Sequence, residues 1–344
     1  MNETNPIGVL LIQLGTPDST EVADVRSYLR QFLSDPRVID LPAPARALLL
    51  NAVILPFRPR RSAEQYEKIW TEAGSPLTIH TENLAREVQA ELGDGYRVAF
   101  GMRYKNPPIA IGVAELMAAN CERIVILPLF PQYASASTGS ALEEALRVLG
   151  GLWNVPDVAT IGPFYDDPGF VRAVASVARP HLDAFNPDHV ILSYHGLPEK
   201  QVRKSDPTGR WCLANDSCCD RIVEANRYCY RAQCFATTRA LSTELELNPS
   251  RFSTTFQSRL AGQKWIEPYT DVELAGLHAS EVRRLAVLTP SFTADCLETL
   301  EEIGIRLRKQ WEGIGGDDLL VVPCLNAAPA WVSAVAGLVR KAAS

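Results

Sequence analysis

Residues 189–198 read HVILSYHGLP, an apolar run that ends in His195, a glycine and, two residues later, a proline. A continuous apolar strand of this kind is typical of a parallel sheet that is covered on both faces. Residues 7–17, IGVLLIQLGTP, have the same form and end in the same glycine and proline. The two stretches therefore predict a buried strand in each half of the chain.

A second pair of segments repeats this relation between the halves. Residues 121–133, CERIVILPLFPQY, and residues 282–292, VRRLAVLTPSF, each give an apolar strand, then a proline and an aromatic loop. Helical patterns lie between the strands, at 81–92, 140–149 and 169–182. Alternating strands and helices predict βαβ units in a doubly wound parallel sheet. We therefore predict an α/β protein with two such domains, divided near residues 160–170 and related by duplication, whose strand ends face one ligand-binding cleft.

The composition restricts the class of protein. The chain has 344 residues, 47% of them hydrophobic, and its formal net charge of −6 argues against a nucleic-acid partner, which needs a basic face. The apolar N-terminal stretch follows no basic segment and is too short to span a bilayer, so we expect a cytoplasmic protein without disulfides. The sequence contains no P-loop motif, and no glycine-rich dinucleotide motif follows its first strand, so the usual signs of nucleotide binding are missing.

His195 lies at the predicted carboxyl end of its strand, where open α/β sheets bind ligands. Gly196 follows it and lets another part of the backbone approach closely. The alternative is a half-buried histidine that is hydrogen-bonded to the backbone and has no further role. The other four histidines lack this context, and we expect them at the surface or at helix ends: His80, His181, His189 and His278.

Acidic residues gather in the segment 290–304, PSFTADCLETLEEIG, which follows a predicted strand in the same half as His195. On a helix, Asp295, Glu298 and Glu302 stand at i, i+3 and i+7 and so share one face. A neutral imidazole facing carboxylates can accept protons and guide a divalent metal ion. The alternative is a solvated group of acids near a helix N-terminus, where the helix dipole favours them.

Three further segments offer the lining of a binding site. These are GMRYKNPP (101–108), PLFPQYASAST (128–138) and FQSRLAGQKWIEPYTD (256–271). Together they supply aromatic surface, arginines and small residues, which suit a flat apolar ligand that carries acid groups. Taken singly, each is more often part of a core or a loop.

Five of the eight cysteines lie within 23 residues: Cys212, Cys218, Cys219, Cys229 and Cys234. Packing does not explain such crowding in a reducing compartment, whereas four thiolates with one to spare fit a metal site. The spacing lacks the short Cys-x-x-Cys pairs of zinc ribbons, which disfavours zinc, and free thiols are the other alternative. The neighbours Cys218 and Cys219 would point apart in a regular helix or strand. Cys121, Cys296 and Cys324 are expected to pack in the core.

Five of these motifs, in order along the chain, resemble the signatures of ferrochelatase, which inserts Fe(II) into a porphyrin at the end of haem synthesis. They are LLIQLGTP, GMRYKNPP, LSYHGLP, FQSRLAGQKWIEPYTD and FTADCLETLEEI. The resemblance runs from about residue 7 to residue 335. It implies the chelatase fold, with two Rossmann-like halves, four-stranded parallel sheets and limits of 1–165 and 166–344. The first half would carry an active-site lip at about 42–62, and the second the catalytic histidine and a cysteine-rich insertion at 209–238.

The resemblance also implies roles for single residues. His195 matches the catalytic histidine and Glu298 its acidic partner, so that the substrate Fe(II) would bind at these two residues in a file that continues to Glu302. The implied porphyrin contacts are Leu14, Arg103, Tyr104, Trp265 and Asp271. Cys296 stands where some relatives have a second histidine, and it receives no role. Whether His195 accepts protons or carries the metal is left open.

Some ferrochelatases carry a 2Fe–2S cluster, and in certain bacteria it lies internally at about this place. The resemblance therefore implies the bacterial form with an internal cluster, held by four of the five crowded cysteines. Cys234 is the doubtful ligand, because some relatives without a cluster also have a cysteine there. A structural role is expected for the cluster, since iron insertion moves no net electrons.

The expected substrates are protoporphyrin IX and Fe(II), and the expected product is protohaem. A chelatase for coproporphyrin or cobalt is an alternative enzyme, and a porphyrin or metal carrier without turnover is an alternative of another class. The apolar segment 46–62, RALLLNAVILPFRPRRS, ends in basic residues and is expected to cover the porphyrin and to touch a membrane surface, unless it is an ordinary buried helix and loop. The sequence does not indicate an oligomeric state.

Overall fold

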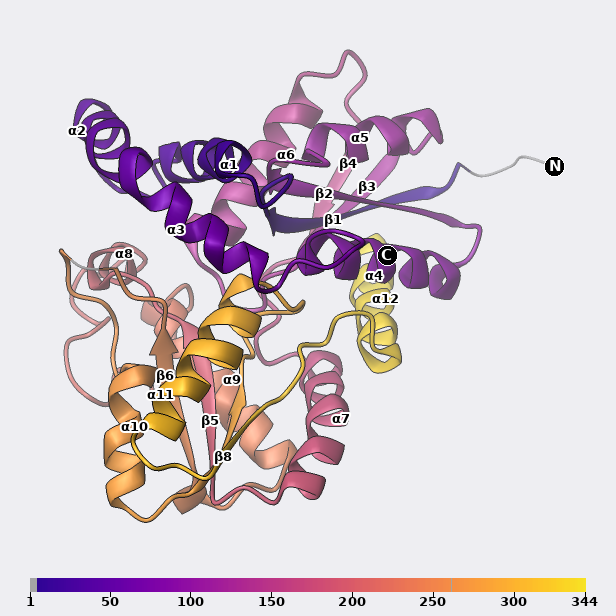
Figure 1. The fold of residues 1–344 in the computed structure, drawn as a ribbon. Coiled ribbons are helices and arrows are strands. Elements are labelled where there is room, and N and C mark those ends of the chain that lie inside the picture. The colour runs from indigo at the N-terminus through magenta and orange to yellow at the C-terminus, as the bar shows by residue number, and fades with distance from the viewer. Residues whose placement is uncertain (1–4, 261) are drawn as a thin grey trace. The chain divides into compact units, whose positions relative to one another are not determined.

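The computed structural model describes residues 5–260 and 262–344, which form two compact units (Figure 1). The first unit contains the chain up to Phe130 together with Ser135–Gly162 and Val332–Ser344. The second contains Pro131–Ala134 and Pro163–Trp331. Relative to the predicted halves 1–165 and 166–344, two segments belong to the other unit: the short loop Pro131–Ala134 and most of the C-terminal helix, Val332–Ser344.

The first unit is built on a four-stranded parallel sheet with the order β2-β1-β3-β4. Its strands are β1 (Ile7–Gly15), β2 (Tyr96–Tyr104), β3 (Arg123–Pro128) and β4 (Asp157–Thr160). The central strand β1 is apolar except for Gln13, as expected of a strand whose two faces are covered, and residues 9–12 have no exposed surface.

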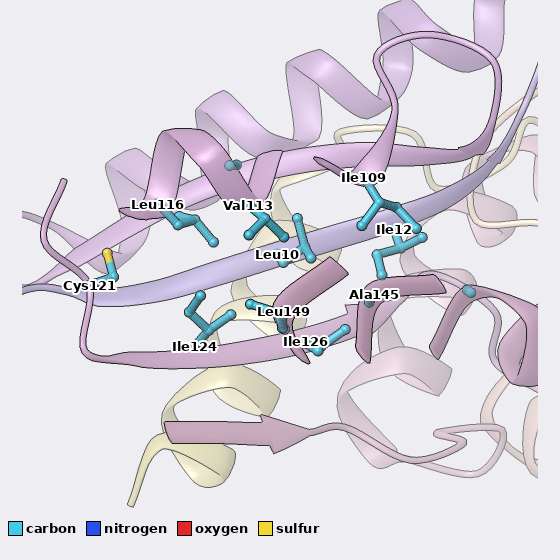
Figure 2. Packing of buried hydrophobic residues seen from close by; sticks show 12 residues of the cluster. Leu10, Ile12, Ile109, Val113, Leu116, Cys121, Ile124, Ile126, Ala145 and Leu149 are labelled. Atoms are coloured by element: carbon cyan, nitrogen blue, oxygen red, sulfur yellow. The ribbon is translucent and has the colours of Figure 1, made fainter. Parts of the chain in front are cut away.

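Helices cover this sheet, and Figure 2 shows one covered face. Side chains of α5, among them Ile109 and Val113, point toward Leu10 and Ile12 of β1, and Leu149 of α6 packs into the same cluster. The helical segments of the unit are α1 (Val22–Ser34), α2 (Ala43–Leu48), η1 (Leu49–Ile54), α3 (Leu55–Glu67), α4 (Pro76–Leu92), α5 (Ile109–Ala118), η2 (Ser135–Gly139), α6 (Ser140–Gly150) and most of α12 (Pro329–Ala343).

The second unit repeats the sheet, with four parallel strands in the order β6-β5-β7-β8. Its strands are β5 (His189–His195), β6 (Phe252–Gln257), β7 (Arg284–Leu288) and β8 (Asp318–Val321). Its helical segments are α7 (Pro168–Phe185), α8 (Glu199–Lys204), η3 (Glu224–Asn226), α9 (Tyr230–Glu244), η4 (Pro249–Arg251), α10 (Thr270–Ala279), η5 (Glu298–Leu307) and α11 (Arg308–Gly313). Leu274, Ile303 and Trp311 from three of these segments form a core with β5, β7 and β8.

The predicted fold class is confirmed: the molecule is an α/β protein with two four-stranded, all-parallel sheets. In each sheet the first strand of the unit pairs with the second on one side and the third on the other. This identical strand order is what duplication of one unit would produce.

The predicted lip at 42–62 folds as the helical run α2, η1 and α3. It is not an ordinary buried helix, because Leu48, Val53 and Phe57 are 69%, 55% and 76% exposed. Among the residues that the structure describes, no helix has both the length and the apolar character needed to cross a membrane.

Candidate active site

His195 is the last residue of β5 and pairs in register with Gln257 of β6. The backbone on both sides of its ring is fixed: the His195 amide donates to Ser291 Oγ at 3.1 Å, and the Gly196 amide donates to the Gln257 carbonyl oxygen at 2.8 Å. A Cβ atom on Gly196 would lie only 2.8 Å from that carbonyl oxygen, so the close approach requires glycine. The strand end therefore presents the imidazole from a rigid position.

The ring of His195 has a defined tautomer when it is neutral. Its Nδ1 lies 2.6 Å from the Gly196 carbonyl oxygen. A carbonyl oxygen only accepts hydrogen bonds, so Nδ1 must carry the proton and Nε2 keeps its lone pair. The ring is partly exposed and lies 6.5 Å from the Trp265 ring and 6.3 Å from the Phe292 ring, measured between centroids. Nε2 is thus the atom available to accept a proton or to bind a metal ion.

The acidic helix differs from the one expected. Residues 298–307 form η5, a π-helix whose hydrogen bonds span five residues, so α-helical spacing does not describe it. Asp295 precedes this helix and is buried, where it accepts hydrogen bonds from Asn326 Nδ2 at 2.8 Å and Thr299 Oγ1 at 3.0 Å. The expectation that Asp295 shares the acidic face is therefore wrong, because its carboxylate is already occupied within the fold.

Glu298 is held at the start of η5 through both its backbone and its side chain. Its carbonyl oxygen accepts a hydrogen bond from Gln257 Nε2 at 3.1 Å, and its Oε2 accepts one from the Cys296 thiol at 3.1 Å. The Gln257 side chain also accepts from Ser193 Oγ at 2.8 Å. Gln257 therefore connects the strand that ends in His195 with the helix that begins at Glu298.

Glu302 lies on the same helix as Glu298, η5. Its carboxylate accepts hydrogen bonds from the Ser258 amide at 2.9 Å and the Ser258 hydroxyl at 2.5 Å. Burial raises the pKa of the Glu302 carboxyl above its usual value, although the Ser258 hydrogen bond and the charges of Arg306 and His195 act to lower it. The pKa of Glu302 also responds to the charge of Glu298. The structure thus brings His195, Glu298 and Glu302 within electrostatic reach of one another.

The two other predicted site residues of the second unit differ in their surroundings. Trp265 is buried beside the His195 ring, and its indole Nε1 is buried without a hydrogen-bond partner. Asp271 is bound by both terminal nitrogens of the Arg259 guanidinium, which also lies 4.3 Å from the centre of the Tyr269 ring. Trp265 therefore forms a wall of the histidine site, whereas Asp271 lies in a surface ion pair.

The predicted site residues of the first unit lie near the ends of β1 and β2. Leu14 is partly exposed. Arg103 and Tyr104 both donate to Asp35 Oδ2, at 3.0 and 2.8 Å, and Tyr104 has no exposed surface. Ser140 Oγ donates to the same oxygen at 2.5 Å. In this arrangement the tyrosine and the arginine hold α1, β2 and α6 together.

Four of the crowded cysteines form one buried group: Cys212, Cys218, Cys219 and Cys229. The sulfur atoms of Cys218 and Cys219 lie 3.6 Å apart. These neighbours would point apart in a regular helix or strand, but the segment 205–223 that contains them is a series of turns, bends and irregular residues. Hydrogen bonds join Cys219 to Cys229 and Cys229 to Cys212. The bond with Cys229, together with burial, raises the pKa of the Cys219 thiol. The bond with Cys212, together with burial, raises the pKa of the Cys229 thiol, although the bond with Cys219 acts to lower it.

The turns around these cysteines are fixed by polar side chains. Asp206 accepts hydrogen bonds from the amides of Trp211 at 2.6 Å and Cys212 at 2.9 Å. Burial alone would raise the pKa of the Asp206 carboxyl, but the hydrogen bonds it accepts lower it well below its ordinary value. Arg231 donates to Cys219 Sγ at 3.2 Å. The fifth thiol, Cys234, lies inside α9 and hydrogen-bonds to Tyr230.

In the part of the chain that the structure describes, no three or more histidine, cysteine, aspartate or glutamate side chains are arranged as a metal-binding group. The sulfur atoms are therefore in contact along a chain and do not surround one point. The same holds for His195 and the two glutamates, which share a region without converging on one atom position.

Sequence reasoning missed four residues of the site: Gln257, Ser258, Ser291 and Cys296. Gln257 is the last residue of the strand β6 and Ser258 follows it, and a polar pair at a strand end is a signal that could have identified them. Ser291 and Cys296 lie within the segment that leads from β7 into η5. Their contacts depend on how that segment turns, which the sequence does not reveal.

Comparison with known proteins gives a consistent result. A family model described as ferrochelatase matches residues 6–343. The chain is 46% identical over 341 residues to the ferrochelatase of Coxiella burnetii (strain CbuK_Q154), covering 99% of this chain and 95% of that protein. It is 46% identical over 335 residues to the ferrochelatase of Legionella pneumophila (strain Lens), covering 97% of this chain and 98% of that protein.

Two solved structures share the fold. SirB from Bacillus subtilis with Fe3+ has a TM-score of 0.58 at 12% identity, covering 98% of this chain and 96% of that one. The sirohydrochlorin chelatase SirB from Bacillus subtilis subspecies spizizenii, in complex with cobalt, has a TM-score of 0.55 at 11% identity, covering 98% and 95%. The sequence matches confirm the predicted ferrochelatase function and the enzyme class, a metal chelatase of the lyases. The chain belongs to the ferrochelatase family.

Proposed function

We propose that the protein inserts Fe(II) into protoporphyrin IX to give protohaem, with His195 and Glu298 as the catalytic residues. The observation that carries this proposal is the imidazole at the end of β5, whose Nε2 keeps a free lone pair while Glu298 and Glu302 lie within its electrostatic reach. Leu14, Arg103, Tyr104, Trp265 and Asp271 remain the predicted porphyrin contacts.

The residue types suit the two requirements of metal insertion. The porphyrin must lose two pyrrole protons, and imidazole is the side chain that exchanges protons most readily near neutral pH. The Fe(II) ion must lose its water ligands, and the carboxylates of Glu298 and Glu302 can replace them stepwise as oxygen donors. The aromatic rings of Trp265 and Phe292 lie beside His195 and give the proton acceptor a partly apolar surrounding. In this scheme His195 accepts protons and the glutamates carry the metal.

The decisive experiment is anaerobic turnover with Fe(II) and protoporphyrin IX, with coproporphyrin and Co(II) as parallel substrates. The His195→Ala variant should keep porphyrin binding and lose metallation by about 10²–10⁴-fold. His189→Gln is the matched control, because His189 lies at the other end of the same strand and hydrogen-bonds to Ser253 at 3.0 Å. Near-normal metallation by His195→Ala would refute the proposed role, and porphyrin binding without turnover by the unaltered protein would indicate a carrier.

We also propose that Cys212, Cys218, Cys219 and Cys229 hold a 2Fe–2S cluster and that Cys234 does not. The support is the donor set: four buried thiols in one chain of contacts, with the Arg231 guanidinium against a sulfur atom to compensate negative charge. We do not include Cys234 among the cluster ligands, because its thiol is hydrogen-bonded to Tyr230 within the regular helix α9. When bound, the cluster would supply cross-links among turns that have little regular structure.

Anaerobic purification followed by iron and sulfide counts tests the cluster. Serine variants at each of the four proposed ligands should lose the visible thiolate-to-iron absorption. Cys234→Ser, the matched control with a buried thiol in the next helix, should keep it. A colourless protein with stoichiometric zinc, or loss of the cluster in Cys234→Ser with retention in one of the four, would contradict the assignment.

We further propose that the protein is cytoplasmic and touches a membrane surface through its lip. The exposed side chains of Leu48, Val53 and Phe57 lie on the same helical run as the exposed Arg60 and Arg61, a combination that favours an anionic lipid surface. The double variant Leu48→Asp/Phe57→Asp should no longer co-float with anionic vesicles. Trp153→Asp, which alters an aromatic residue that is 99% exposed outside the lip, should float as before.

A further inference from the structure

Cys296 lies against the predicted catalytic carboxylate, although the sequence suggested only a packing role for it. Its sulfur is 3.1 Å from Glu298 Oε2. The thiol is buried, whereas Glu298 is partly exposed. The sulfur therefore approaches the carboxylate from the protein side and leaves the other side of Glu298 open to an incoming ligand.

The position of this sulfur is set by the start of the acidic helix. The Cys296 amide donates to Thr299 Oγ1 at 3.0 Å, and its carbonyl oxygen accepts from the Leu300 amide at 3.0 Å. These backbone hydrogen bonds fix Cys296 as part of the first turn that carries Glu298. The contact between thiol and carboxylate is thus a fixed feature of this turn.

The direction of the hydrogen bond follows from the surroundings of the thiol. The Cys296 sulfur lies at hydrogen-bond distance from Glu298 Oε2, and a carboxylate oxygen accepts hydrogen bonds while a thiol can donate one. The sulfur therefore carries its proton and donates to the carboxylate, which is the acceptor.

We propose that Cys296 positions the Glu298 carboxylate for incoming Fe(II) and determines how the site discriminates between divalent metal ions. The proposal rests on the proposed function, in which Glu298 binds the metal substrate. The S–H···O bond fixes the orientation of the carboxylate and leaves Oε1 without this constraint. Cys296 is therefore a positioning residue, since it acts through Glu298.

Discrimination follows from the different affinities of oxygen and sulfur for metal ions. Fe(II) binds to the carboxylate oxygen while the thiol keeps its proton. A softer ion such as Cd(II), once bound at Oε2, can form a metal–sulfur bond as the S–H bond breaks and the proton passes to solvent. The site should therefore be sensitive to soft cations through this one sulfur atom.

Two substitutions separate the two effects. Cys296→Ser keeps a hydrogen-bond donor at the same place and removes the soft ligand, so the KM for Fe(II) should change by less than about threefold while the inhibition constant for Cd(II) rises about tenfold. Cys296→Ala removes both, so the KM for Fe(II) should also rise about tenfold, the cost of losing one hydrogen bond to a charged group. Cys324→Ser is the matched control, since that buried thiol faces Thr289 Oγ1 at 3.5 Å.

A second measurement does not depend on turnover. Cd(II) should give a thiolate-to-cadmium absorption in the unaltered protein that is smaller by one thiolate in Cys296→Ser and unchanged in Cys324→Ser. Unchanged KM and Cd(II) inhibition in a folded Cys296→Ala variant, or a missing difference in the absorption, would overturn the proposal. If the unaltered protein forms no haem, the proposed function fails, while the absorption still decides whether Cys296 binds the metal.

Discussion

In the first unit the central strand β1 ends with Leu14 and Gly15, and in the second unit β5 ends with His195, which Gly196 follows. Aligned on these glycines, Leu14 and His195 occupy equivalent places, and both side chains are partly exposed. The same sheet therefore presents a hydrocarbon side chain in one unit and an imidazole in the other. The comparison shows that the two units repeat the same scaffold and differ in the residue type at this strand end, where the proposed function places the proton acceptor.

One carboxylate from each unit, Asp35 and Glu302, can be compared by the hydrogen-bond donors around it. In the first unit the Asp35 carboxylate accepts hydrogen bonds from Arg103, Tyr104 and Ser140, which are three donors of the same unit. In the second unit Glu302 is only partly buried; Ser258 is its main hydrogen-bond donor, and Arg306 lies 3.8 Å away. The first carboxylate has three donors within its unit, whereas the second is the one that the proposed function assigns to the metal substrate.

The largest effect is expected when the second strand end is made to resemble the first. His195→Leu replaces the predicted proton acceptor by leucine, the residue type found at the equivalent position Leu14. Anaerobic metallation should therefore fall by about 10²–10⁴-fold, with porphyrin binding retained. Leu14→Ala, which shortens the side chain at the equivalent position of the first unit, should lower turnover by less than about tenfold. Equal losses in the two variants would show that the strand ends do not differ in their chemistry.

The second effect concerns the glycines that follow these residues. Gly15 has a φ of +112°, and a Cβ there would lie 1.9 Å from the Tyr104 carbonyl oxygen, whereas a Cβ on Gly196 would lie 2.8 Å from the Gln257 carbonyl oxygen. Gly15→Ala should therefore reduce the free energy of unfolding by about 3 kcal/mol and Gly196→Ala by about 1–2 kcal/mol. Urea denaturation measures both, and the reverse order would contradict the difference in backbone crowding.

The third effect compares the carboxylates of Asp35, which is buried, and Glu302, which is partly buried. Asp35→Asn leaves Arg103 without its carboxylate and should destabilise the protein by about 3 kcal/mol, as expected when one partner of a buried pair is removed. Glu302→Gln removes a charge whose burial is unfavourable, so the free energy of unfolding should change by less than about 1 kcal/mol. A urea midpoint that falls as far in Glu302→Gln as in Asp35→Asn would remove this contrast.

The smallest effect is the pH dependence of stability. Burial is outweighed at Asp35 by the hydrogen bonds of Ser140, Arg37 and Tyr104, which hold its pKa below the ordinary 3.8. Its contribution to stability is therefore complete above that pH and is lost as the pH falls through the folded value. Glu302 has a pKa raised above 4.5, so the folded state should instead gain stability as the pH falls toward 4.5. Differences between each variant and the unaltered protein, measured from pH 3 to pH 7, should show these opposite slopes.

Much of the fold could be predicted because buried parallel strands are apolar along their whole length. The runs that begin at residues 7 and 189 became β1 and β5, and His195 was recognised from its place at a strand end. The same reasoning failed for His189, expected at the surface or a helix end, because it begins the same buried strand and is itself buried. Burial lowers the pKa of His189, in keeping with that position.

The details of the site could not be predicted because they depend on contacts that are distant in sequence or on backbone register. The segment 298–307 has the composition of an α-helix, and nothing in its periodicity reveals hydrogen bonds that span five residues. The partner of Arg103 and Tyr104 is Asp35, nearly 70 positions away, which no local pattern connects to β2. The meeting of Cys218 and Cys219 depends on a turn that the sequence does not specify.

The C-terminal helix α12 has a consequence for how the chain is made. The segment Val332–Ser344 belongs to the first unit, where Val335 and Val339 have no exposed surface and Arg340 donates to the Glu91 carbonyl oxygen at 2.9 Å. A ribosome releases these residues only after the second unit has been synthesised, a delay on the order of ten seconds or more at about 5–20 residues per second. The apolar surface that they cover is unprotected during that interval. The half of the molecule that leaves the ribosome first is the half that is completed last.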